Sequence, residues 1–379
     1  MSRPKMAVTP ASAGVRPEAG SSTARPRRDG LNRQRWHAPL ILAAAIALVA
    51  IVASPSQTRL GIVIACYAIA GIGLSVLAGT TRIVNLGVSA FFGLGAFVTA
   101  SLIPVVELPI ALVAAAVASM LLGLVLSPVA GRLTGVFMAI LTVGVALLAQ
   151  HVFRILPGWT GGTAGRTVED PVVAGIRVTE DIIVSGTTVP GETVYFLVCA
   201  VLLVLTAVAT TNLLRSRSGR ALSTLAASPV TARSFGISPA RYRSMAFLYS
   251  SALAGIAGGL FAGYSGFVSY EQFSVELSIQ LLAVVVLGGL GSVYGIVVAA
   301  VILVGLPEVV LSLRGWLPFV AGSGSTEGFT ADQFSAVLYG LALAVVMVAE
   351  PRGLTGLWHR FHTSRAARAI PHLARRSSP

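Results

Sequence analysis

Long apolar runs, separated by short polar or glycine-rich segments, make up most of this chain. A bilayer core about 30 Å thick is crossed by an α-helix of about 20 apolar residues, because backbone polar groups must then bond within the helix. The pattern predicts ten such spans, the first and eighth of them short: 39–54, 60–79, 84–103, 108–127, 133–153, 193–214, 244–264, 276–288, 296–312 and 334–349. We therefore expect an all-α, polytopic integral membrane protein with eight to ten transmembrane helices.

The placement of charge predicts the orientation of these spans. Lys and Arg are retained on the cytoplasmic side of a membrane. If the chain begins in the cytoplasm, its inner segments hold 22 of the 27 Lys and Arg residues, and its outer segments hold 11 of the 14 acids. Both termini are therefore expected inside. The same topology explains the net charge of +13 better than nucleic-acid binding does, because the basic residues interrupt the spans and do not line one folded face.

The composition divides the chain into three regions. Residues 1–38 are rich in Arg, Pro, Ser and Gly and predict a disordered, basic cytoplasmic tail. Residues 39–357 form the transmembrane domain, and residues 358–379 form a second basic cytoplasmic tail.

Two long loops leave the membrane domain. The outer loop, 154–192, has Val- and Ile-rich stretches that predict a short β-hairpin, which either docks a soluble partner or covers the membrane surface. The inner loop, 215–243, holds six arginines and no acid.

The chain lacks the groups that would make it an enzyme or an ion-driven pump. Ionisable residues deep in a span mark proton or ion paths, and the predicted spans carry essentially none, although sodium coupling through the carbonyls of broken helices remains open. A P-loop needs a lysine, and the single lysine here is Lys5. No catalytic constellation is present. Cys66 and Cys199 predict neither a metal site nor a disulfide framework. We expect no metal and no cofactor in this chain.

Glycines suggest where helices approach one another. Gly255, Gly259 and Gly263 recur every four residues and give one flat helix face, which suits close packing or a gate. In "FFGLGAF" (91–97) two glycines either unwind a helix beside a substrate path or kink it. The segment "LGGLGSVYG" (287–295) predicts a tight turn between two spans.

The inner loop contains the start and stop signals of a short helix. Ser228 is the expected N-cap, Pro229 the first helical residue and Gly236 the residue that ends the helix. So short a helix is unstable alone in water. Its apolar residues, Val230, Ala232 and Phe235, either pack on the protein's own membrane ends or enter a groove on a separate cytoplasmic protein.

Five segments, in order, resemble the branched-chain amino acid ABC transporter permease family, in its LivM-type branch. The similarity covers roughly residues 60–357. The segments are "GIGLSVLAGTTRIVNLGVSAFFGLGAF" (71–97), "TGGTAG" (160–165), "SGRALSTLAASPVTARSFGISPARYRSMAFLYSSALAGIAGGLFAGYSGFVS" (218–269), "LSIQLLAVVVLGGLGSVYG" (277–295) and "LYGLALAVVMVAEPRGLTGL" (338–357).

The resemblance implies a subunit of an importer in the bacterial plasma (inner) membrane. An external solute-binding protein would deliver branched-chain or related amino acids to this chain and a second permease subunit, a LivH-type chain, and two cytoplasmic ABC ATPases would supply the energy from ATP. Residues expected to couple to an ATPase are Gly219, Arg220, Ala221, Ala232, Arg233, Phe235, Gly236 and Ile237. Residues expected along the substrate path are Asn85, Ser89, Phe91, Phe92, Gly93 and Gly95.

The sequence departs from the family pattern at three positions. Pro229 stands where the family usually has an acid before an Ala-Ala pair, and Thr231 replaces the first alanine, which changes the expected ATPase contact. Val88 stands where many relatives have histidine, which bears on substrate choice.

Other functions remain open on the sequence alone. Close relatives carry urea or short amides, and sugar or nucleoside permeases are more distant. A self-contained secondary transporter or channel predicts uptake by the chain alone, whereas the importer predicts none without its ATPases and binding protein. A scaffold without transport predicts that Gly93→Leu or Gly259→Leu leaves uptake unchanged.

Overall fold

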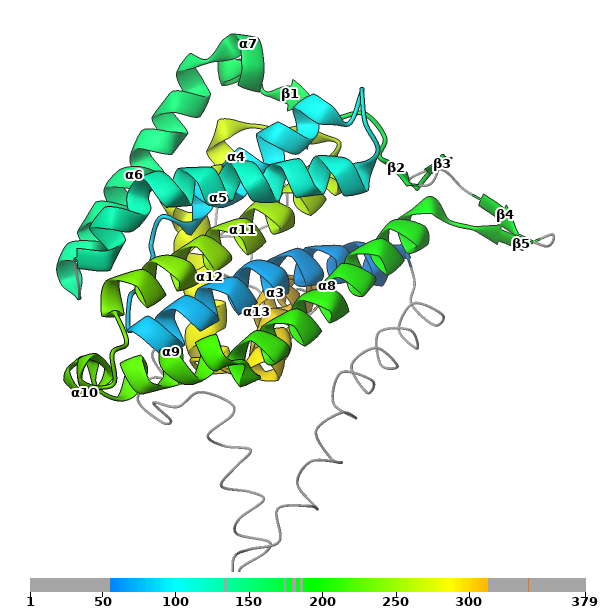
Figure 1. The fold of residues 1–379 in the computed structure, drawn as a ribbon. Helices are drawn as coiled ribbons and strands as arrows, with labels where there is room; N and C mark the ends of the chain where they lie inside the picture. Colours follow the sequence, from blue (N-terminus) through cyan, green and yellow to red (C-terminus); the bar gives the residue numbers. More distant parts are fainter. Residues whose placement is uncertain are drawn as a thin grey trace, which may run out of the picture.

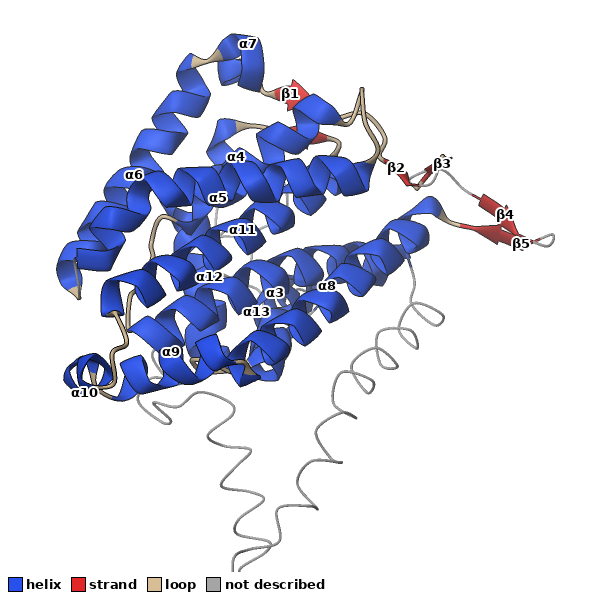
Figure 2. Ribbon diagram, viewed as in Figure 1, coloured by secondary structure: helices blue, strands red, loops and turns tan. Residues whose placement is uncertain are grey.

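The computed structural model describes residues 55–312, apart from 133–134, 174, 179–181 and 185–186, together with residue 340. The predicted first and tenth spans and both terminal tails lie outside the described residues. Within the described part the fold is a bundle of helices with a few very short strands, which confirms the all-α polytopic prediction (Figure 1, Figure 2).

Eight apolar helices account for the second to ninth predicted spans. Five of the helices in the described residues are long and apolar enough to cross a membrane: α3 (Pro55–Thr81), α5 (Leu108–Arg132), α6 (Val136–Ile155), α8 (Gly191–Arg215) and α11 (Pro239–Ser265). The other three are α4 (Val88–Leu102), α12 (Val275–Gly288) and α13 (Val293–Ser312).

Short elements gather at the two ends of the bundle. One end, which we name the outer end after the predicted orientation, carries α7 (Pro157–Thr160), η1 (Gly162–Ala164), β1 (Arg166–Thr167), β2 (Val172–Val173), β3 (Ile176–Arg177), β4 (Ile182–Val184), β5 (Thr187–Val189), β6 (Phe267–Val268) and η2 (Tyr270–Phe273). The opposite, inner end carries α9 (Arg217–Ala227) and α10 (Pro229–Ser234).

The strands form three antiparallel pairs. The pairs β2–β3 and β4–β5 are two hairpins in the Val- and Ile-rich outer loop, where the sequence predicted one. The third pair joins β1 to β6, with Arg166 opposite Val268, and so fastens the outer loop to the chain that leaves α11.

Helix α11 lies at the centre and packs against α3, α4 and α5. Its glycines make these approaches possible. A Cβ on Gly255 would lie 2.6 Å from the carbonyl oxygen of Ala115 in α5, and one on Gly259 would lie 2.8 Å from Leu112 Cδ2. Without a hydrophobic driving force between helices in lipid, such small-residue contacts provide the van der Waals packing that holds the bundle together.

The turn between α12 and α13 is as tight as the sequence predicted. Gly289 and Gly291 have φ angles of 92° and 80°, which L side chains rarely adopt. Ser75 Oγ on α3 accepts a hydrogen bond of 3.0 Å from the Gly291 N–H. A buried polar group of α3 therefore satisfies the backbone of the turn and fixes its position against the bundle.

Candidate functional site

A non-helical segment separates α3 from α4 inside the bundle. The Gly87 N–H donates to Asn85 Oδ1 at 2.9 Å, the Leu86 N–H to Thr142 Oγ1 of α6 at 3.0 Å, and the Ser89 N–H to Ser278 Oγ of α12 at 3.0 Å. Helix starts leave such donors unpaired, so three side chains from different elements replace water here. This explains why α4 starts at Val88, four residues after the start of the predicted span 84–103.

The predicted path residue Asn85 therefore caps its own backbone. Asn85 and Ser89 are both buried, with exposed fractions of 1% and 0%. The hydroxyl of Ser89 has no hydrogen-bond partner among the residues that the structure describes, and within them it keeps an unused donor and acceptor in the interior.

The remaining predicted path residues lie on α4 and are also buried. Helix α4 runs unbroken through Gly93 and Gly95, so the two glycines do not unwind it. A Cβ on Gly93 would come within 2.8 Å of the rings of Phe153 and Phe273, and one on Gly95 would overlap the backbone of Gly255. Phe91 and Phe92 face the same interior. In this conformation all six predicted path residues lie in the packed interior, and none of them lines either of the two pockets described below.

Aromatic rings close the outer end above Gly93. The centroid of Phe97 lies 4.9 Å from that of Phe153, 5.5 Å from that of Phe273 and 6.0 Å from that of Trp159. The Thr-Gly-Gly element follows as a turn in which Gly161 and Gly162 have φ angles of 78° and 60°. The buried hydroxyl of Thr160 accepts a 3.2 Å hydrogen bond from the Gly162 N–H and so holds this turn closed.

The inner loop folds into two helices. α10 has the predicted signals: Ser228 Oγ accepts from the Thr231 N–H at 3.3 Å, Pro229 is in the first turn, and Gly236 has a φ angle of 73°. The Ile237 N–H donates to the Ala232 carbonyl at 3.0 Å and completes the C-terminal cap.

The sequence did not predict α9. Ser216 caps it by accepting from the Gly219 N–H, and Ala221, Leu222 and Leu225 form its buried face. The signal was present as apolar residues three and four apart, which is the spacing of one helix face.

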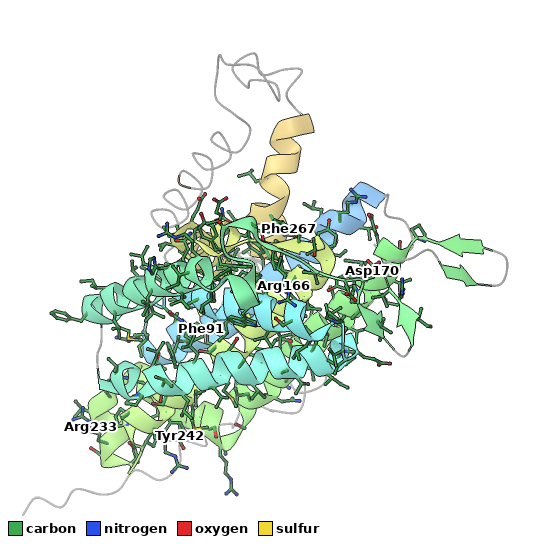
Figure 3. All side chains as sticks on the ribbon, turned by 90° about the horizontal axis from the view of Figure 1, so that it is seen from above. Phe91, Arg166, Asp170, Arg233, Tyr242 and Phe267 are labelled. Carbon is green, nitrogen blue, oxygen red and sulfur yellow. The ribbon has the colours of Figure 1, made fainter. Side chains whose placement is uncertain are left out.

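The predicted coupling residues divide by exposure. Gly219, Ala221 and Ala232 are buried, Ile237 is half-buried, and Arg220, Arg233, Phe235 and Gly236 are exposed. Gly219 lies so close to the carbonyls of Leu213 and Leu214 that a side chain would overlap them. The buried members hold α9 and α10 in place, and only the exposed members are open to a partner. In Figure 3 Arg233 and Tyr242 lie near the lower left edge of the bundle, apart from Arg166, Asp170 and Phe267.

Comparison with known proteins identifies the family. Residues 56–347 match the family described as "Branched-chain amino acid transport system / permease component". The chain belongs to this permease family. Over 307 residues the permease is 32% identical to the "High-affinity branched-chain amino acid transport system permease protein LivM" of Escherichia coli (strain K12), a match that covers 76% of this chain and 67% of the relative. The protein of the same name from Salmonella typhimurium (strain LT2) gives the same identity and coverage. No solved structure gives a significant match.

Two pockets open on the sides of the permease. One is an apolar groove of ≈ 550 Å³ between α5 and α8, with Leu112, Val117, Leu197 and Val201 in its walls. The other is a polar cavity of ≈ 330 Å³ between α6 and η2, lined by Leu147, Gln150, His151, Arg154 and Tyr270. The sequence did not predict the polar cavity, although its signal was present as three polar residues, Gln150, His151 and Arg154, within five positions at the end of an apolar run.

Proposed function

We propose that this permease is a membrane subunit of an ATP-binding-cassette importer in the bacterial inner membrane. It translocates branched-chain or related amino acids, together with a LivH-type second permease subunit. An external solute-binding protein delivers the amino acid. Two cytoplasmic ABC ATPases bind and hydrolyse ATP, since the sequence of this chain has no P-loop, and we assign no cofactor to the chain itself.

The exposed face of α10 is the observation that supports this proposal best. Ala232 is fully buried against the rest of the permease, whereas Val230 and Phe235 are 72% and 74% exposed. The short helix and its C-cap residue therefore bury one small residue against the described part of the permease and expose two large apolar side chains at the inner end. Large exposed apolar residues on a helix of fixed position are typical of a contact that inserts into a groove on another protein.

The charges around α10 indicate an acidic rim on that groove. The Nε atom of Arg243 is buried and has no hydrogen-bond partner among the described residues, and the Arg243 guanidinium is partly desolvated and also subject to the positive charge of Arg233. No acid occurs in residues 215–243 to neutralise either one. A buried donor next to a like charge is costly, so a carboxylate from a docked ATPase would stabilise both groups. Pro229 leaves the start of α10 without the usual acid, which makes the basic C-terminal side the stronger contact.

Copurification tests the proposal. The permease is purified from its native membrane in mild detergent, either as the parent chain or as Phe235→Asp, and the proteins that accompany it are identified. We expect an ABC ATPase with the parent chain and at least tenfold less with Phe235→Asp, because a charge would enter the apolar groove. Ile176→Asp is the matched control, since Ile176 is 50% exposed on β3 at the outer end.

Two outcomes would contradict the proposal. If neither the parent chain nor the control retains an ATPase, and vesicles that contain the permease alone accumulate amino acid, the chain is a self-contained transporter. If Phe235→Asp retains the ATPase at the parent level, coupling does not involve this face of α10.

A further inference from the structure

The exposed faces of the spanning helices differ in polarity. On α5 the large exposed side chains are apolar along its length, for example Val113, Val117, Leu121 and Leu124. On α8 they are Leu197, Val201 and Leu205. Such faces suit contact with lipid chains, because an apolar side chain gains no hydrophobic free energy by moving from lipid hydrocarbon to another helix.

Helix α6 presents a different face. Its inner half exposes Phe137 and Ile140, but its last two turns carry Gln150, His151 and Arg154, of which the histidine and the arginine are exposed. Polar and ionisable side chains on a spanning helix are expensive in lipid and face cavities or partners. An arginine at the end of a helix can extend to the membrane surface, so Arg154 alone would indicate little.

A second observation is that these side chains line a cavity. The polar cavity between α6 and η2 has a volume of ≈ 330 Å³, near the lower end of the range of about 300–1,000 Å³ found for small-molecule sites. Leu147 provides an apolar wall, and Gln150, His151, Arg154 and Tyr270 provide polar groups. The cavity joins a spanning helix to the segment that follows α11 and β6, directly beside the outer aromatic cluster of Phe97, Phe153, Phe273 and Trp159.

Hydrogen bonds within the cavity fix which groups remain available. Arg154 Nη2 donates to His151 Nδ1 at 3.3 Å. Because a guanidinium only donates, Nδ1 must accept, and the imidazole then carries its proton on Nε2 as a further donor. The Tyr270 hydroxyl donates to Glu271 Oε1 at 3.2 Å, which places a carboxylate next to the opposite wall.

We propose that this cavity binds the amino acid as it enters the permease, with Arg154 as the main contact to the α-carboxylate. This inference rests on the proposed function and names the site at which that function begins. His151 Nε2–H and the Gln150 amide supply further donors to the carboxylate, and Glu271 with Tyr270 offers acceptors to the α-ammonium group. Leu147 contacts the aliphatic side chain. The guanidinium of Arg154 suits a carboxylate because it can donate two parallel hydrogen bonds, and the Glu271 carboxylate that accepts from Tyr270 adds a negative charge beside the lining for the ammonium group.

The test uses the complete importer, purified with its partner subunits, reconstituted in lipid vesicles and supplied with its binding protein. Uptake of radiolabelled leucine, isoleucine and valine and the affinity for the binding protein are both measured. The variants are Arg154→Gln, Arg154→Lys and, as a matched control, Arg177→Gln, which removes an exposed arginine from β3 on the same side of the membrane. We expect Arg154→Gln to lower the uptake rate about tenfold or more, as loss of a charge-assisted hydrogen bond predicts. Arg154→Lys should restore part of that loss, and Arg177→Gln should behave as the parent.

Each other outcome overturns the inference in a distinct way. If Arg154→Gln weakens binding-protein affinity and a saturating amount of binding protein restores uptake, the cavity docks that protein. If Arg154→Gln takes up amino acid at the parent rate, Arg154 is an anchor at the lipid headgroups. If the parent importer itself carries none of the three amino acids, the proposed function fails before any variant is compared.

Discussion

Gly95 of α4 and Gly255 of α11 meet backbone to backbone, so closely that a Cβ on Gly95 would overlap the Gly255 carbonyl. On its other side Gly255 lies against Ala115 and Ser119 of α5, and the Ser119 hydroxyl donates to the Phe91 carbonyl at 2.9 Å. Three helices are therefore held together at one crossing by two residues without side chains. The glycines of "FFGLGAF" are accounted for by this contact, and α4 has no need to unwind there.

Gly95→Ala should destabilise the permease. Since the neighbouring atoms are backbone, the helices must separate, and overpacking of this kind costs about 1–3 kcal/mol. Gly305→Ala in α13 is the control, because a Cβ there meets no atom of the described residues within 4 Å and alanine favours helix. The two variants are compared by thermal unfolding in the same detergent. Equal melting temperatures would mean that the α4–α11 contact is looser than the structure shows.

Thr142→Val should destabilise the start of α4. The valine keeps the shape of the side chain but removes the acceptor for the Leu86 N–H, and a buried donor left unpaired costs about 1–3 kcal/mol. Thr80→Val is the matched control, because within the described part of the chain the Thr80 hydroxyl donates to the Val76 carbonyl of its own helix and accepts no backbone N–H. We expect lower unfolding temperatures for Thr142→Val alone. If both variants unfold like the parent, water or another group replaces the lost acceptor.

Labelling of single introduced cysteines should show that the two ends of the bundle lie on opposite sides of the membrane. Phe235→Cys and Ile176→Cys each put a thiol at an exposed position, at the inner and the outer end respectively. With a membrane-impermeant maleimide, we expect Ile176→Cys to be labelled in intact spheroplasts and Phe235→Cys only in inverted vesicles. The unmodified chain is the control: Cys66 and Cys199 are both fully buried and should remain unlabelled. The opposite labelling pattern would reverse the predicted orientation.

The class of the protein and much of its local structure follow from the amino-acid sequence alone. Apolar run length predicted the helices because each span satisfies its own backbone in lipid, a requirement that neighbours do not alter. The ends of α10 could also be predicted, from Ser228, Pro229 and Gly236, because helix capping depends on residues that are adjacent in sequence. The tight turn at Gly289 and Gly291 was likewise predicted from nearby glycines.

Which of these residues contact one another depends on the packing of helices that are distant in sequence. The start of α4 depends on Thr142 and Ser278, which lie 56 and 189 residues away from the backbone groups they bind. The β1–β6 pairing also joins residues that are far apart in sequence. So does the polar cavity, which is lined by residues of α6 and by Tyr270 of η2. Asn85 and Gly95 were predicted along a substrate path, and the structure places them in packed interior contacts. Nearest neighbours in sequence fix the backbone locally, whereas contacts between distant helices follow from complementary shapes that a single sequence does not display.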